Sequence, residues 1–139
     1  MLPRKFKIPA QIAEVDPLIL LLKATAEELM GPDQLLSLEL AAIEALTNIV
    51  VHGCAHQPDA IIKVELSAGS GSLSLMICDP GRPLQDRAFE NALDLDQIDP
   101  TAQSGRGIAM IKACSDVIIY THTPEQNCLT LIFRNGKAL

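Results

Sequence analysis

The sequence predicts an α+β fold, a two-layer α/β sandwich in which helices cover one face of a mixed, mostly antiparallel sheet. Three observations support this: two apolar segments with helical spacing at 17–30 and 35–52, a hairpin of β-rich runs at 60–78, and a second strand pair at 116–134. The order of these elements is typical of helices packed on one face of a sheet. With 139 residues, 48% of them hydrophobic, we expect a single domain over residues 1–139.

The first elements have clear boundary signals. Residues 4–8 alternate polar and apolar side chains and are followed by Pro9, which predicts a short edge strand. Asp16-Pro17 is a helix-start pattern, and Gly31-Pro32 ends that helix. The periodic apolar residues of 35–52 predict the second helix.

The hairpin and the C-terminal half follow. Turn residues 68–71 join strands at 60–67 and 73–78. Residues 82–104 show weak periodicity, and so long a connection is rare without a role, so we expect a lid over a site with a short helix near 89–93; the alternative is a disordered insertion. A third helix opens at 104–107, and strands at 116–123 and 128–134 complete the fold.

Charge, apolar runs and cysteine spacing exclude several classes of partner and site. The net charge is −6, the pI is near 4.9 and there are no basic runs, so neither nucleic acid nor an anionic membrane is expected as a partner, and a basic protein fits better. The longest apolar run, 17–22, is too short to span a bilayer and no signal-peptide pattern is present, which predicts a cytoplasmic protein. The four cysteines are widely spaced and are expected to be buried reduced thiols, without a zinc site.

A polar strip inside the second helix is the first candidate site. Glu44, Asn48 and His52 lie four residues apart and therefore follow one side of the helix. The amide oxygen of Asn48 suits Mg²⁺, and Glu44 could accept the proton of an attacking hydroxyl during phosphoryl transfer. The alternative is a strip that faces solvent, and His52 is expected to have a capping or packing role at the edge of the site.

Two further motifs could hold a nucleotide. Asp79 ends a buried strand, and its carboxylate could accept a hydrogen bond from the amino group of adenine while Gly81 lets the purine approach the backbone; the alternative is a simple turn. Gly105-Arg106-Gly107 at a helix start exposes amides to phosphate, or forms only a tight turn.

Taken together, these motifs resemble those of the GHKL ATP-binding superfamily, which has the Bergerat, histidine-kinase-like fold. Within it the chain looks like the bacterial anti-sigma-factor serine kinases of partner-switching systems. The resemblance runs from Phe6 to Phe133 and is carried by residues 44–53, Cys78-Asp79-Pro80-Gly81, Ser104-Gly105-Arg106-Gly107-Ile108 and Ser115-Asp116-Val117.

The resemblance implies roles for individual residues. Glu44 would be the general base and Asn48 the magnesium ligand, with ATP and Mg²⁺ as cofactors. The nucleotide-binding residues would be Asn48, Asp79, Gly81, Ser104, Gly105, Arg106, Gly107 and Thr130.

Two departures from the family pattern are visible. Gln103 stands where some members have an arginine, so that cation is absent or supplied by Arg106 or Arg82. The last strand reads Asn127-Cys128-Leu129-Thr130 where members often have Gly-Thr.

The resemblance also implies an activity and partners. The chain would phosphorylate a serine of a small STAS-type anti-sigma-factor antagonist, sequester a sigma factor, and form a homodimer. Two alternatives remain: a non-catalytic nucleotide-binding regulator that sequesters a protein partner, and a detached histidine-kinase-like ATPase domain. Glu44 favours the kinase, because a histidine-kinase domain needs no base at that position.

Overall fold

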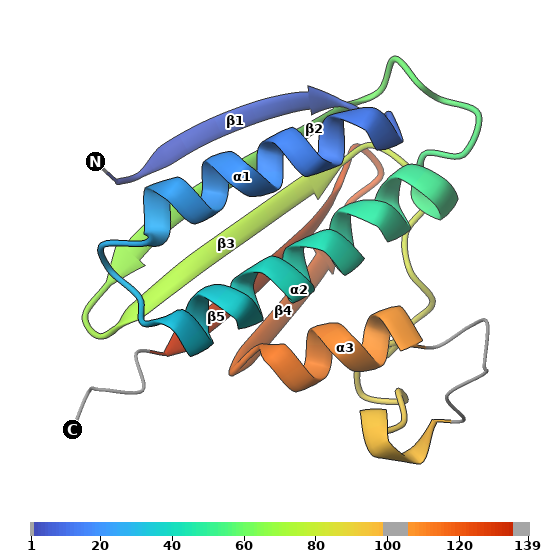
Figure 1. Cartoon of the computed structure of the whole chain (residues 1–139). Coiled ribbons are helices and arrows are strands. Elements are labelled where there is room, and N and C mark those ends of the chain that lie inside the picture. The colour runs from blue at the N-terminus through green and yellow to red at the C-terminus, as the bar shows by residue number, and fades with distance from the viewer. Residues whose placement is uncertain (1, 99–105, 135–139) are drawn as a thin grey trace.

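The computed structural model describes residues 2–98 and 106–134, and it confirms a two-layer α+β fold with helices on one face of a sheet (Figure 1). Short helical turns occur at Ile12–Glu14, Ile49–Gly53 and Leu95–Gln97. The main elements are β1 (Arg4–Pro9), α1 (Val15–Ala26), α2 (Pro32–Asn48), β2 (Ile61–Gly69), β3 (Ser72–Asp79), α3 (Arg106–Cys114), β4 (Val117–His122) and β5 (Asn127–Arg134).

The sheet has the strand order β1-β2-β3-β5-β4, so β1 is an edge strand as predicted. All four ladders are antiparallel, and no parallel pair occurs among the described strands, where the sequence suggested a mixed sheet. The reason is that β4 and β5 form a hairpin, and β5 rather than β4 joins β3. The end of β3 therefore lies beside the start of β5, with Asp79 opposite Asn127.

Side-chain alternation in β3 and β5 separates a core face from an outer face. Leu75 and Ile77 are fully buried toward the helices, as is Leu131 of β5, whereas Met76 on the outer face is 37% exposed. Because successive side chains of a strand point to opposite faces, the same two strands supply both the core and the outer surface.

Helix α2 crosses the sheet between α1 and α3 (Figure 1). Small side chains at Ala41, Ala42 and Ala45 are buried beneath it, so the helix can lie close to the strands. With its π-helical end, Pro32–Gly53 is 22 residues long and has a mean hydropathy of 1.5, enough by length and composition alone to cross a membrane. A core helix of a globular domain can have the same length and composition, and 28% of this apolar window is buried against the rest of the fold.

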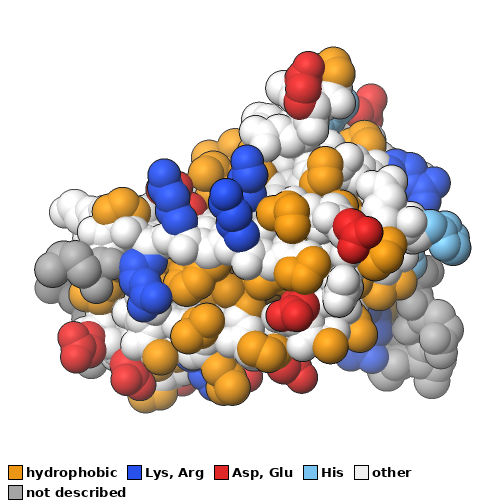
Figure 2. Space-filling model, turned by 90° about the horizontal axis from the view of Figure 1, so that it is seen from above, with side chains coloured by type: hydrophobic (Ala, Val, Ile, Leu, Met, Phe, Trp, Pro, Cys, Tyr) orange, Lys and Arg blue, Asp and Glu red, His pale blue; other side chains and the backbone are white. Residues whose placement is uncertain are grey.

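Charge is distributed unevenly over the two layers. Figure 2 shows Lys and Arg side chains gathered on the face seen from above, and β1 and β2 contribute four exposed basic residues, Arg4, Lys5, Lys7 and Lys63. In the helices, Lys23 pairs with Glu39 at 2.9 Å, and the other charged residues of 14–44 are acidic. The segment 14–44, which covers α1 and most of α2, is therefore strongly acidic, whereas β1 is basic.

The cysteine prediction is wrong for one pair. Cys78 of β3 and Cys128 of β5 are direct cross-strand partners and form a disulfide, while Cys54 and Cys114 are free. The two residues are 50 positions apart in the chain. Their contact depends on the register between β3 and β5, which cysteine spacing does not reveal.

Two local predictions also differ from the structure. The second helix begins at Pro32, three residues earlier than expected, and its last turn is π-helical rather than α-helical. No helix forms at 89–93; instead a 3-10 turn covers Leu95–Gln97, where Asp94 and Gln97 cap each other. Reciprocal capping stabilises a helix start, which explains the later position of the turn.

We predict that Leu75→Ala lowers the free energy of unfolding by about 2–5 kcal/mol, because it removes a fully buried side chain and leaves a cavity. Met76→Ala, the adjacent outer-face change, should cost about 1 kcal/mol or less. Urea unfolding of the two variants measures both values. Equal losses would contradict the assignment of the two faces.

Candidate functional site

A cavity of about 540 Å³ lies between α2, α3 and the end of β3, within the size range of sites for nucleotide-sized ligands. Predicted residues from four separate segments line it: Glu44, Asn48 and His52; Asp79; Arg82; and Arg106 with Gly107. Apolar walls come from both layers and from the segment after β3. The polar residues form two groups in an otherwise mainly apolar cavity: Glu44 and Asn48 lie beside Gly107, and Asp79 lies beside Gly53.

The first end is formed by α2 and the start of α3. A Cβ atom added to Gly107 would lie 3.0 Å from Glu44 Oε2 and 3.0 Å from Asn48 Nδ2. The absence of a side chain at Gly107 therefore lets the start of α3 approach the strip on α2. This contact joins the Glu-Asn strip to part of the glycine motif in one place.

The second end is formed where the π-helical turn Ile49–Gly53 meets the loop after β3. The N–H of Arg82 donates to the carbonyl of Gly53 at 2.7 Å. A side chain at Gly81 would collide with the carbonyl of Gly53 and lie 2.9 Å from Cys54 Sγ. Gly81 thus allows the loop after β3 to pack closely against the turn at Ile49–Gly53. It does not line the cavity but lies in the layer of residues next to it.

Asp79 is the buried charged group of this end, with 6% of its surface exposed. Its Oδ2 accepts hydrogen bonds from the N–H of Gly81 at 2.9 Å and from the side-chain amide of Asn127 at 3.3 Å. Burial raises the pKa of Asp79 above its ordinary value, and these two hydrogen bonds partly oppose that rise. A ligand that donates a further hydrogen bond would favour the ionised form.

Asn127 and Tyr120 belong to the site although the sequence analysis did not select them. Asn127 is 3% exposed and also donates to the carbonyl of Gly81 at 2.8 Å, so one amide joins β5 to the end of β3 and to the start of the loop that follows. The sequence did contain one indication of this role: Asn127 begins the last strand, at the point where this chain departs from the Gly-Thr that is common in the family. Tyr120 lines the cavity, and its hydroxyl accepts a hydrogen bond from the N–H of Leu84 at 2.9 Å.

The described part of the predicted lid lies beside the cavity. Phe89 lines the cavity, and its ring centroid is 6.3 Å from that of Tyr120. From α3, Lys112 donates to the carbonyl of Ala92 at 3.2 Å and lies 3.8 Å from Asp94. These contacts place the segment against α3 as well as against β4. Lid movement stays a prediction.

The predicted residues divide into three groups. Glu44, Asn48, His52, Asp79, Arg106 and Gly107 line the cavity, and Gly81 supports it. Gln103, Ser104 and Gly105 lie outside the described residues. Thr130 does not line the cavity: Leu129 faces it, and Thr130, the next residue of β5, lies on the outer face beside Met76, away from the place that its predicted role in nucleotide binding requires.

The donor set fits a magnesium ion bound together with phosphate. In residues 2–98 and 106–134 no cluster of three or more His, Cys, Asp and Glu side chains could hold a metal ion alone. Glu44 and Asn48 supply only a carboxylate and an amide oxygen. Magnesium commonly keeps few protein ligands and completes its octahedron with phosphate oxygens and water, so the single amide oxygen of Asn48 suits a magnesium–nucleotide complex and leaves Glu44 available as a base.

Three comparisons, of the sequence with family models and with curated proteins and of the fold with solved structures, show what this chain is similar to. Two curated anti-sigma F factors of Clostridium botulinum, from strains Alaska E43 and Eklund 17B, are 30% and 29% identical over 79 residues. Each match covers 57% of this chain and 46% of the relative, so the aligned region is less than half the length of those relatives.

The fold matches a solved structure, the RsbU and RsbW domains of Rv1364c from Mycobacterium tuberculosis, with a TM-score of 0.67 over 96% of this chain and 32% of that one. At 18% identity, this likeness shows the fold alone. Residues 8–133, nearly the whole domain, match the family model of the histidine kinase-like ATPase domain. The chain therefore belongs to the histidine kinase-like ATPase domain family.

Proposed function

We propose that this protein binds Mg·ATP and transfers its terminal phosphoryl group to a serine of a small STAS-type anti-sigma-factor antagonist. We further propose that it acts as an anti-sigma factor by sequestering a sigma factor. The observation that supports the catalytic proposal best is the meeting of Glu44, Asn48, Asp79 and Gly107 around one cavity. The similarity to anti-sigma F factors supports the choice of partners.

The base of the nucleotide would occupy the end near Asp79. A carboxylate accepts hydrogen bonds and cannot donate them, so it would bind the amino group of adenine and disfavour the keto oxygen of guanine. Leu129 and Ile49 line the same cavity and offer apolar surface to the ring. The Gly81 N–H and the Asn127 amide hold Asp79 in place before the ligand arrives.

The phosphates would extend toward Glu44, Asn48 and the start of α3. Arg106 lies beside Gly107 at this end, whereas Arg82 follows the loop at the base end, so Arg106 is better placed to face phosphate. Asn48 would hold the magnesium ion, which when bound neutralises charge on the phosphate oxygens. Glu44 would accept the proton of the serine hydroxyl at a carboxylate oxygen as that hydroxyl attacks.

Charge supports a basic docking surface on the protein partners. Residues 14–44, which cover α1 and most of α2, carry seven acidic residues and one lysine, and opposite charge speeds encounter and helps to select partners.

The direct test is incubation of the purified protein with labelled ATP, magnesium and its antagonist. Transfer of label to serine is the expected result. Nucleotide binding without transfer would instead support the regulator that only binds nucleotide, and label on a histidine would support a histidine-kinase-like domain.

We predict that Glu44→Gln leaves ATP affinity within about three-fold of wild type and lowers phosphoryl transfer by about 10²-fold or more, because the amide keeps the shape and cannot accept the proton. Binding by calorimetry and transfer by labelling separate the two effects. The matched control is Glu39→Gln on the same helix, whose carboxylate pairs with Lys23 outside the cavity. Normal transfer by Glu44→Gln would exclude Glu44 as the base.

Asn48→Ala should remove the dependence of ATP affinity on magnesium. In wild type the metal should tighten binding, because Asn48 links it to the helix. In the variant, dissociation constants with magnesium and with a chelator should agree within about two-fold. Thr47→Ala, one residue earlier and away from the cavity, should keep the wild-type difference. A full magnesium effect in Asn48→Ala would count against this ligand.

Acidification should weaken ATP binding through Asp79. Because burial raises its pKa, protonation and loss of the adenine contact should begin at a higher pH than for an ordinary aspartate. The folding contribution has the opposite sign: a raised carboxyl pKa favours the folded state at low pH and loses that contribution as pH rises through the folded-state value.

The measurement is ATP affinity over a series of decreasing pH values, where wild type should weaken as Asp79 takes up a proton at a higher pH than an ordinary aspartate does. Asp79→Asn should bind about ten-fold more weakly and lose this part of the pH dependence. Identical pH profiles for the two proteins would rule out Asp79 as the titrating group.

A further inference from the structure

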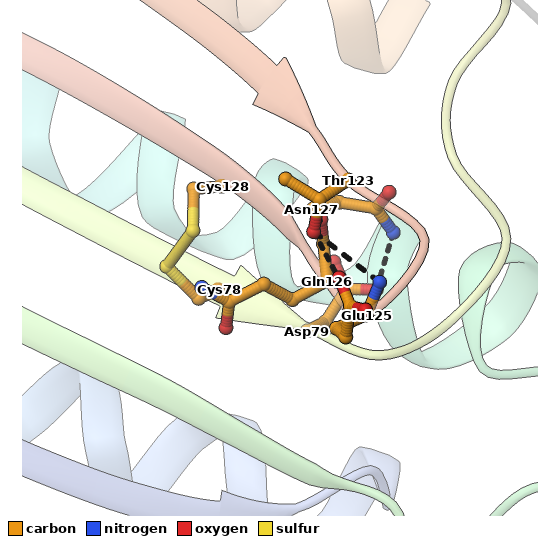
Figure 3. The surroundings of a disulfide bond; sticks show 7 residues. All are labelled: Cys78, Asp79, Thr123, Glu125, Gln126, Asn127 and Cys128. Atoms are coloured by element: carbon orange, nitrogen blue, oxygen red, sulfur yellow. Dashed lines mark hydrogen bonds between the residues drawn. A yellow bond between two sulfur atoms is a disulfide. The ribbon is translucent and has the colours of Figure 1, made fainter.

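A disulfide lies directly behind the base end of the cavity. Cys78 and Cys128 face each other across β3 and β5, with their Cα atoms 4.2 Å apart, on the outer face of the sheet (Figure 3). This spacing is typical of an antiparallel pair without direct backbone hydrogen bonds, where side chains are closest. The function proposed above makes no use of this bond.

Each cysteine is the chain neighbour of a residue that builds the site. Cys78 precedes Asp79, and Cys128 follows Asn127. Figure 3 shows the disulfide on one side and the pair Asp79 and Asn127 on the other. Since the amide of Asn127 donates both to Asp79 and to the carbonyl of Gly81, the disulfide fixes the spacing of the two strands at the point where this network begins.

The bond can be approached from the outer face. Cys128 is half-buried, whereas Cys78 is 7% exposed, so attack should occur at the sulfur of Cys128. Lys63 of β2 is the direct cross-strand neighbour of Cys78, and Lys7 of β1 is the neighbour of Lys63 on the same face. An ammonium group close to a thiolate stabilises it, and this register puts Lys63 within reach of Cys78, so we expect Cys78 to be the leaving group.

We propose that Cys78 and Cys128 form a reversible redox site that takes a dithiol as reductant and a disulfide as oxidant, and whose state controls the order of the base-binding end. The proposal rests on the proposed function in one respect: a protein that binds sigma factors acts in the cytosol, where persistent disulfides are rare and those that form are usually transient or redox-sensing.

Reduction proceeds by thiol–disulfide exchange. A thiolate of the reductant attacks Cys128 Sγ, a mixed disulfide forms, and the Cys78–Cys128 bond breaks to release the Cys78 thiolate, which takes up a proton. The second thiol of the reductant then displaces Cys128 as a thiolate, which is also protonated. The protein gains two electrons and two protons, and the reductant leaves as a disulfide. Oxidation by a disulfide reverses these steps.

Opening the bond removes a restraint at this position. Without the covalent link, only non-covalent contacts hold the end of β3 beside the start of β5. The hydrogen bond from Asn127 to Asp79, already long at 3.3 Å, joins the chain neighbours of the two cysteines and is the contact most directly affected. The reduced protein should therefore hold Asp79 less firmly.

The test compares the full chain after treatment with oxidised glutathione and after treatment with dithiothreitol. Alkylation in denaturant followed by mass spectrometry should count two free thiols in the first state and all four in the second. Hydrogen–deuterium exchange should be faster in the reduced state for peptides covering 79–84. ADP should bind about five-fold more weakly in the reduced state, as expected from loss of about one hydrogen bond.

Two variants provide the controls. Cys128→Ser should behave like the reduced protein under both treatments, and Cys114→Ser, at a free cysteine outside the cavity, should keep the full response. Four thiols after oxidation, or equal exchange at 79–84 in both states, would overturn the redox inference. Failure to bind ADP in either state would overturn the proposed function instead, because thiol counts and exchange are measured without nucleotide.

Discussion

The buried carboxylate of Asp79 is the constraint on which the site depends. A charge with so little exposed surface is costly unless hydrogen bonds compensate for the lost water. The compensating donors come from two directions, the loop through Gly81 and β5 through Asn127, while the thiol of Cys54 lies 4.0 Å away. Satisfying one carboxylate therefore fixes how the end of β3, the start of β5 and the end of α2 meet.

Close backbone contacts make this arrangement possible. Gly81 packs against Gly53 at one end of the cavity, and Gly107 packs against the strip on α2 at the other. At Gly81 a Cβ atom would collide with the backbone of Gly53, whereas at Gly107 it would crowd the side-chain ends of Glu44 and Asn48. Glycines thus allow the second helix with its π-helical turn, the loop after β3 and the start of α3 to come together at the two ends of the cavity. The walls between these ends are mainly apolar.

The two faces of the sheet are also linked. Alternation along β3 and β5 places Asp79 and Asn127 on the cavity side and the adjacent cysteines on the outer side. A chemical change on the outer surface can therefore reach the ligand site through a single peptide unit in each strand. The same alternation keeps Thr130 off the cavity side, because the cavity-side residues of β5 occupy every second position.

Much of the fold and part of the site could be read from the sequence. Helical spacing in α2 predicted that Glu44 and Asn48 share a side, and the alternation and turn residues of the hairpin predicted β2 and β3 close to their observed bounds. These features depend on neighbours in the chain, whose geometry follows from the periods of the helix and the strand. The motif order was sufficient to indicate the family.

Other features were decided only by the tertiary structure. The pairing of Cys78 with Cys128, the role of Asn127 and the outward position of Thr130 all follow from the register of β5 against β3. The contact of Gly107 with Glu44 and Asn48 depends on how α3 packs on α2. Register and packing arise between segments separated by tens of residues, where local periodicity carries no information about which residues will meet.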